Sequence, residues 1–213
     1  MEQNNKVSIS LFEQALGKDW QNVAPVVQKH YGLRPYSKDE IELEGIMSVY
    51  YSLAAFVLLA PARLFAGPVL LREDNIPVHV KNNAQPQSKA MHWHRSFKTA
   101  SQTKPLLFHS CMEYAGGNEV IEYIGSNPRF CMGIKMAIRQ EQGAIIYEST
   151  GYLLKLGTLR LPLPGHMFLG RAWIEEKASD DQEIAMKFFI KHPLWGRIYS
   201  YSGTFSICPS PDD

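Results

Sequence analysis

The segment Trp93-His94-Arg95-Ser96-Phe97 places an arginine between two large aromatic residues, each two positions away. Side chains two apart share one face of a β-strand, so Trp93, Arg95 and Phe97 would lie together. A guanidinium stays charged when it is buried, so an arginine inside a cavity requires a carboxylate partner. Two interpretations are open. Arg95 either reaches solvent at a sheet end with its aliphatic stem packed, or it pairs with a buried acid.

Glu148 is the acid that the sequence favours as this partner. It follows Ile145, Ile146 and Tyr147 in the middle of a long strand candidate, where a charge is out of place. The rest of its strand face is mostly apolar. We therefore expect Arg95 and Glu148 to approach within salt-bridge distance on the concave side of a curved sheet. The alternative is that Glu148 faces water from a half-exposed sheet.

Two tyrosines near the C-terminus could complete the same pocket. Tyr199 and Tyr201 are spaced by two and share a strand face with Gly203. Together with Trp93 and Phe97 they would line an apolar cavity. Ordinary core packing is the alternative, because aromatic side chains are common in protein cores.

Other kinds of chemistry find little support in the sequence. His92 and His94 share a strand face and His109 could approach from the next strand, but no nearby residue supplies a fourth metal ligand. We expect no metal and no cofactor, and interpret these histidines as exposed on the convex face. The chain has no Gly-x-Ser-x-Gly nucleophile motif, and Gly116–Gly117 opens a strand rather than a phosphate-binding helix.

The composition is that of an ordinary globular protein. Of the 213 residues 45% are hydrophobic and 20% charged, and the net charge is +1. The basic residues are dispersed, so we expect no nucleic-acid partner, and membrane contact is not expected. The three cysteines, Cys111, Cys131 and Cys208, contain no Cys-x-x-Cys pair, which favours a reducing, cytoplasmic location. The oligomeric state is left open.

Two short helices and a longer one are predicted in the first third of the chain. Ser10 and Glu13 have capping-box spacing around a helix that begins at Leu11. Pro25 suits the first turn of a helix over 24–31. The charge-free run 46–62 is shorter than the roughly 20 apolar residues of a transmembrane helix, and it predicts a buried helix over 47–65. A helix followed by a strand, an interfacial helix and a membrane span are the alternatives for this run, and residues 38–43 before it could begin a strand.

From residue 76 onward, short apolar segments alternate with turn residues, which is typical of β-strands. The predicted strands cover residues 76–80, 91–98, 106–114, 119–124, 130–139, 144–156, 159–161, 170–177, 183–191 and 197–207. The longest of them contains Gly151, where a bend or bulge is expected.

Helices followed by a run of strands indicate an α+β fold with an antiparallel sheet. We expect N-terminal helices packed on a strongly curved, mostly antiparallel sheet. Such a half-barrel would be lipocalin-like or START/helix-grip-like. Residues 10–207 would form a single domain between a disordered N-terminus, 1–9, and a frayed tail, 208–213.

The motifs, taken in order along the chain, resemble a known bacterial family. They are LFEQALG from Leu11, His30–Tyr31–Gly32, the W-x-R-x-F of 93–97, Tyr147–Glu148 with Gly151, LPLP from Leu161, and HPLWGRIYSYSGTF from His192 to Phe205. This pattern is similar to that of the DUF4166 family of domains of unknown function, over essentially the whole chain. The resemblance implies a stand-alone bacterial domain and carries over no activity.

These observations favour a binding module that holds a hydrophobic small molecule in the concave cavity of the sheet. Trp93, Phe97, Tyr199 and Tyr201 would be its walls, and Arg95 would anchor a carboxylate or phosphate head group. One alternative is a hydrolase, cyclase or isomerase in the same cavity, with Glu148 as general base and Arg95 stabilising an oxyanion. The other alternative is an interaction domain without a cavity.

Overall fold

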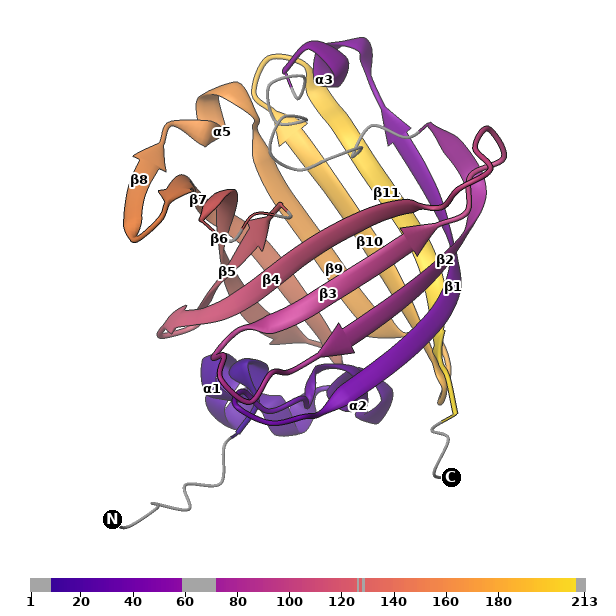
Figure 1. Ribbon diagram of the computed structural model, residues 1–213, viewed down its shortest axis with the longest axis vertical. Helices are drawn as coiled ribbons and strands as arrows, with labels where there is room; N and C mark the ends of the chain where they lie inside the picture. Colours follow the sequence, from indigo (N-terminus) through magenta and orange to yellow (C-terminus); the bar gives the residue numbers. More distant parts are fainter. Residues whose placement is uncertain (1–8, 59–71, 126, 128, 210–213) are drawn as a thin grey trace.

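The computed structural model describes residues 9–58, 72–125, 127 and 129–209 of the chain (Figure 1). Within these residues, eleven antiparallel strands form a single sheet. They are β1 (Glu40–Tyr51), β2 (Glu73–Asn83), β3 (Met91–Phe97), β4 (Leu106–Gly116), β5 (Glu119–Ile124), β6 (Phe130–Glu141), β7 (Ala144–Leu156), β8 (Leu159–Leu163), β9 (Arg171–Ala178), β10 (Glu183–His192) and β11 (Gly196–Ile207). Every strand predicted from residue 76 onward is present, and β5 and β7 have the predicted bounds.

The sheet closes on itself as a ten-stranded barrel. The order is β6-β5-β4-β3-β2-β1-β11-β10-β9-β7, and β6 pairs with β7 to complete the ring. Strand β8 pairs only with β7 and is not part of the ring. The expected antiparallel, strongly curved sheet is therefore confirmed. The half-barrel is corrected to a closed barrel, because β7 pairs with β6 along one edge and with β9 along the other, which leaves the ring no open edge.

Three short N-terminal helices lie across one end of the barrel (Figure 1). They are α1 (Leu11–Leu16), the 3-10 helix η1 (Gly17–Asn22) and α2 (Pro25–Tyr31). The Ser10 side chain accepts from the Glu13 N–H at 3.0 Å and so caps α1, as its spacing predicts. Leu11, Phe12 and Val27 are fully buried against the strands. The helices thus close an end of the barrel, whereas the sequence placed them on the concave sheet.

The segment after residue 39 is a strand where a helix was predicted over 47–65. β1 continues to Tyr51 and only then gives way to α3 (Leu53–Leu58); residues 59–65 lie outside the described part of the chain. In β1, Met47 and Val49 face the barrel interior, while Ile46 and Tyr50 are exposed on the outside. Apolar residues on both faces hid the two-residue period. No helix within the described residues is long and apolar enough to cross a membrane.

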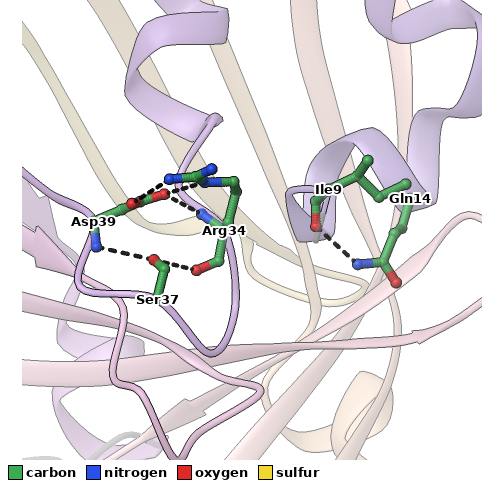
Figure 2. Close-up of polar contacts among 5 residues, drawn as sticks. All are labelled: Ile9, Gln14, Arg34, Ser37 and Asp39. Atoms are coloured by element: carbon green, nitrogen blue, oxygen red, sulfur yellow. Dashed lines mark hydrogen bonds and ion pairs between the residues drawn. The ribbon is translucent and has the colours of Figure 1, made fainter. Parts of the chain in front are cut away.

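A polar loop joins the helices to β1 (Figure 2). The Arg34 guanidinium donates to both Asp39 carboxylate oxygens, at 2.8 and 2.9 Å, and the Arg34 N–H donates to Asp39 at 3.0 Å. The Ser37 hydroxyl donates to the Arg34 carbonyl and accepts from the Asp39 N–H. These bonds, led by that from the Arg34 side chain, lower the pKa of Asp39 to about 2. The loop fixes where β1 begins after α2.

Candidate functional site

The strand register turns Trp93, Arg95 and Phe97 into the barrel. Directly paired residues of antiparallel strands share a face. Arg95 pairs with Val80 on β2 and with Phe108 on β4, and Val80 is buried inside. Trp93 is also buried, and Phe97 packs against the same apolar core. The predicted shared face of these three side chains is therefore found, and it is the inner one.

Arg95 meets an acid inside the barrel, but the acid is Glu122 on β5. The Arg95 Nη2 lies 3.5 Å from Glu122 Oε1, and the two side chains are only 15% and 11% exposed. Arg95 Nη1 donates to the Ser110 hydroxyl at 3.1 Å, and its guanidinium lies 5.3 Å from the centre of the Phe108 ring. Of the two interpretations of Arg95 left open by the sequence, the structure has the pairing with a buried acid, but the acid is Glu122 and not Glu148.

Glu148 lies on the outer face of the barrel, so its predicted pairing with Arg95 is wrong. Its carboxylate is 3.0 Å from Arg139 Nη1 on β6, and its side chain is 53% exposed. A β-bulge at Thr150 adds one residue to β7 beside Gly151, where the sequence predicted an irregularity. The alternation along β7 before this bulge puts Tyr147 and Ser149 inside and Glu148 outside, so Glu148 has no role in an interior site.

Tyr199 and Tyr201 of β11 form the wall of the interior with Phe188 of β10. The Phe188 and Tyr201 rings are stacked at 4.5 Å, and Tyr199 contacts both rings edge-on at 5.8 and 6.2 Å. Burial raises the pKa of both tyrosines above the usual range, and the positive charge of Arg95 opposes that shift. Arg95 therefore acts electrostatically on the aromatic wall as well as on Glu122.

The helix α2 supplies the polar floor of the interior. The Tyr31 hydroxyl donates to the carboxyl of Glu176, which is 2% exposed on β9. Burial raises the pKa of Glu176 to about 8. His30 is also buried, and burial followed by the charge of Arg95 lowers its pKa to about 3. Both groups are accordingly uncharged at neutral pH.

Two buried polar atoms at this floor have no partner within the described residues. They are the Tyr147 hydroxyl and the Oδ1 of Asn82, whose Nδ2 donates to His30 Nδ1 at 3.5 Å. Tyr147 packs against Phe12 and Tyr31 from the closing helices. Burial first, then the charge of Glu122, raises its pKa well above 10. A buried polar group without a partner costs about 1–3 kcal/mol, so these atoms favour a ligand that supplies hydrogen bonds.

The predicted histidine face lies on the outside of β3 and β4. His94 Nδ1 is 2.7 Å from His109 Nδ1, and the His92 ring lies 6.5 Å from that of His94. Within residues 9–58, 72–125, 127 and 129–209, no group of three or more His, Cys, Asp or Glu side chains is arranged to hold a metal ion. The outer histidines are therefore separate from the Arg95–Glu122 site.

A family model described as "Domain of unknown function (DUF4166)" matches residues 23–205. The chain belongs to the DUF4166 family. The match extends from just before α2 to the last residues of β11, so it covers the whole barrel and the helix that supplies His30 and Tyr31. A search of curated proteins found no match to the chain. The candidate site of this DUF4166 domain is therefore the barrel interior around Arg95 and Glu122.

Glu122 is the residue that the sequence reasoning missed. It lies between Val120 and Ile124, the residues that share its strand face. Glu148 lies between Ile146 and Thr150 in a similar pattern. Only the pairing of β5 between β4 and β6 distinguishes an inward Glu122 from an outward Glu148. A charge flanked by apolar residues two positions away was the available signal.

Proposed function

We propose that this domain binds a hydrophobic small molecule inside the barrel, with its polar end at Arg95, Glu122 and Tyr147. The observation that carries the proposal is the Arg95–Glu122 pair, two charged side chains that face inward in a closed barrel whose other inward residues are mostly apolar. Buried ion pairs contribute little to stability on their own, so a fold retains them more readily where they also serve a function.

The aromatic residues support an apolar wall for such a ligand. Inward-facing Phe97, Tyr201 and Met186 are only partly buried, although they belong to the inner surface of a closed ring. Small-molecule sites are lined mainly by apolar and aromatic side chains with a few convergent polar groups. Trp93, Phe97, Tyr199 and Tyr201 are the walls in this account, as the sequence suggested, and Glu148 is excluded from it.

The charge balance favours a neutral polar end on the ligand, such as a hydroxyl or a carbonyl. The positive charge of Arg95 is offset by Glu122, while Glu176 and His30 are uncharged at neutral pH because burial shifts their pKa values to about 8 and about 3. A carboxylate or phosphate would add a second buried negative charge beside Glu122, which is costly. We therefore replace the anionic head group expected from the sequence by a neutral one.

The enzyme alternative loses its general base, because Glu148 is exposed and paired with Arg139. Glu176 is the buried carboxyl with a raised pKa, but its partner is Tyr31 of the closing helix α2. We interpret the Tyr31–Glu176 contact as part of the closure between helix and barrel.

Calorimetric titration with a matched pair of ligands tests the proposal. The pair is a straight-chain alcohol and the carboxylate of the same chain length. The wild-type protein should bind the alcohol more tightly. Glu122→Gln leaves Arg95 without its counter-charge, and should shift the preference toward the carboxylate by roughly ten- to a hundredfold, since a hydrogen bond to a charged group contributes about 1.5–3 kcal/mol.

Glu148→Gln is the matched control, since it makes the same chemical change on the outer face of β7. It should leave both affinities unchanged. If neither ligand binds saturably, the result contradicts a binding function and favours the interaction domain without a cavity. If Glu122→Gln and Glu148→Gln shift the preference between alcohol and carboxylate equally, the ligand binds outside the barrel.

A further inference from the structure

The end of the barrel opposite the N-terminal helices carries exposed apolar side chains on three neighbouring elements. They are α3, the turn between β10 and β11, and the short helix α5 (Gly165–Phe168), all at the upper end in Figure 1. Leu53, Leu194 and Met167, one from each element, are 81%, 79% and 71% exposed. We name this set the apolar rim, which consists of Leu53, Phe56, Val57, Met167, Phe168, Leu194 and Trp195.

Hydrogen bonds hold the three elements of the apolar rim together. The Ser52 N–H, just before α3, donates to the Ile198 carbonyl of β11 at 2.8 Å. His192, at the end of β10, places its Nε2 3.0 Å from the Met167 carbonyl of α5. The Trp195 ring stacks on the same histidine at 4.3 Å. The exposed side chains are thus displayed on a connected surface and not on separate loops.

A row of basic residues lies immediately below the apolar rim. Register pairs Lys191 of β10 with Arg171 of β9 on one side and with Arg197 of β11 on the other. All three are exposed and form no ion pair within the described residues. Residues 164–174 and 184–209 contain no aspartate or glutamate. The surface around these three residues is therefore locally cationic, whereas Glu73 and Asp74 at the start of β2 lie near α3.

The opposite end carries exposed acids together with exposed bases. The turn between β9 and β10 contains Asp180 and Asp181, and Glu183 follows it. Asp19 and Glu40 are also exposed at the helix end. Exposed Lys18 and Lys38 lie at the same end, so acids and bases are mixed there.

We infer that the apolar rim docks on a lipid bilayer that contains anionic phospholipids. Exposed aliphatic and aromatic side chains bordered by basic residues are the features of surfaces that insert shallowly at the membrane interface. Arg171, Lys191 and Arg197 would lie beside the head groups, while the helix end faces away from the membrane. The docked face is the end of the barrel from which an interior ligand would be exchanged, but vesicle binding does not depend on that ligand.

Co-sedimentation with vesicles tests this inference. The wild-type protein should sediment with vesicles of phosphatidylcholine and phosphatidylserine, and less with phosphatidylcholine alone. Two variants address the two features separately. Leu194→Ser with Trp195→Ser removes apolar anchors, and Arg171→Glu with Lys191→Glu reverses two charges. Each should lower the vesicle partition coefficient at least about tenfold, since each basic residue near such a surface contributes roughly fivefold.

Matched controls come from the helix end of the molecule. Tyr36→Ser changes an exposed aromatic residue, and Lys18→Glu with Lys38→Glu reverses two exposed charges. These variants should bind vesicles like the wild type. Absence of wild-type binding to the anionic vesicles, or equal loss in rim and control variants, would overturn the inference. So would a wild-type dimer that Leu194→Ser with Trp195→Ser converts to a monomer without changing vesicle binding. Failure of the ligand titration with intact vesicle binding would reject only the proposed interior function.

Discussion

Tyr31 and Glu176 join the helix that closes the barrel to the barrel wall. The Tyr31 hydroxyl on α2 donates to the Glu176 carboxyl on β9, and both residues are buried. A charged carboxylate at this position would be poorly solvated, so burial raises the pKa of Glu176 to about 8. The protonation state of one side chain is thereby coupled to the attachment of the N-terminal helices.

This coupling predicts a loss of stability as the pH rises. Between the usual glutamate pKa and the value of about 8 in the fold, the native state binds one more proton than the unfolded state. The contribution of Glu176 to the free energy of unfolding is therefore fully present below about pH 4.5, and it is lost as the pH rises to about 8. Urea denaturation from pH 5 to 9 should show a smaller decline for Glu176→Gln than for the wild type, by an amount on the order of a few kcal/mol. Parallel pH profiles of the free energy of unfolding for the two proteins would contradict this contribution of Glu176.

A double-mutant cycle should detect the coupling between Arg95 and Glu122. Arg95→Met and Glu122→Gln each leave a buried charge without its partner, so each should lower the free energy of unfolding by about 3–5 kcal/mol. The double variant should be less destabilised than the sum of the two single changes. Chemical denaturation of the four proteins gives the coupling energy directly. Additive effects would show that the two groups do not interact in solution.

Glu148→Ala should have little effect on either stability or ligand binding. Its contact with Arg139 is an ion pair between largely exposed side chains, and such pairs contribute about 0–1 kcal/mol. Thermal unfolding in low and high salt gives the comparison, since salt screens exposed pairs. A destabilisation as large as that of Glu122→Gln would contradict the position of Glu148 on the outer face of the barrel.

Ser10→Ala should loosen the closing helices. The Ser10 hydroxyl oxygen is the cap of α1, and the loss of such a cap costs about 0.5–2 kcal/mol. Amide hydrogen exchange should accelerate in α1 more than in β3 or β11. Uniform acceleration across the barrel strands would indicate that α1 and the barrel unfold together as one unit.

Local patterns predicted most of the elements in this chain. Turn residues and β-branched or aromatic content located β5 and β7 with their observed bounds, and Ser10 and Pro25 located α1 and α2. The second half of β1 was missed because its outward-facing Ile46 and Tyr50 are as apolar as its inward-facing Met47 and Val49, so that no alternation is visible. The prediction of an apolar helix was the consequence.

Long-range pairing could not be predicted from these patterns. The pairing of β7 with β9 and that of β1 with β11 close the ring between strands that are not consecutive in the sequence, so neither pairing follows from a local hairpin pattern. The same register decides that Glu122 faces Arg95 and that Glu148 does not. Sequence periodicity established that Trp93, Arg95 and Phe97 share a face, and likewise Tyr199 and Tyr201, but only the barrel brings the two groups to one interior.

Native mass spectrometry of the purified protein, followed by denaturing extraction, tests the central claim most directly. A hydrophobic compound at one copy per chain, with an uncharged polar end, is the result that the Arg95–Glu122 interior predicts. If the protein carries no compound, it should take up one equivalent of an added long-chain alcohol. A protein that neither retains a compound nor takes one up would contradict the proposal that this barrel is a binding site.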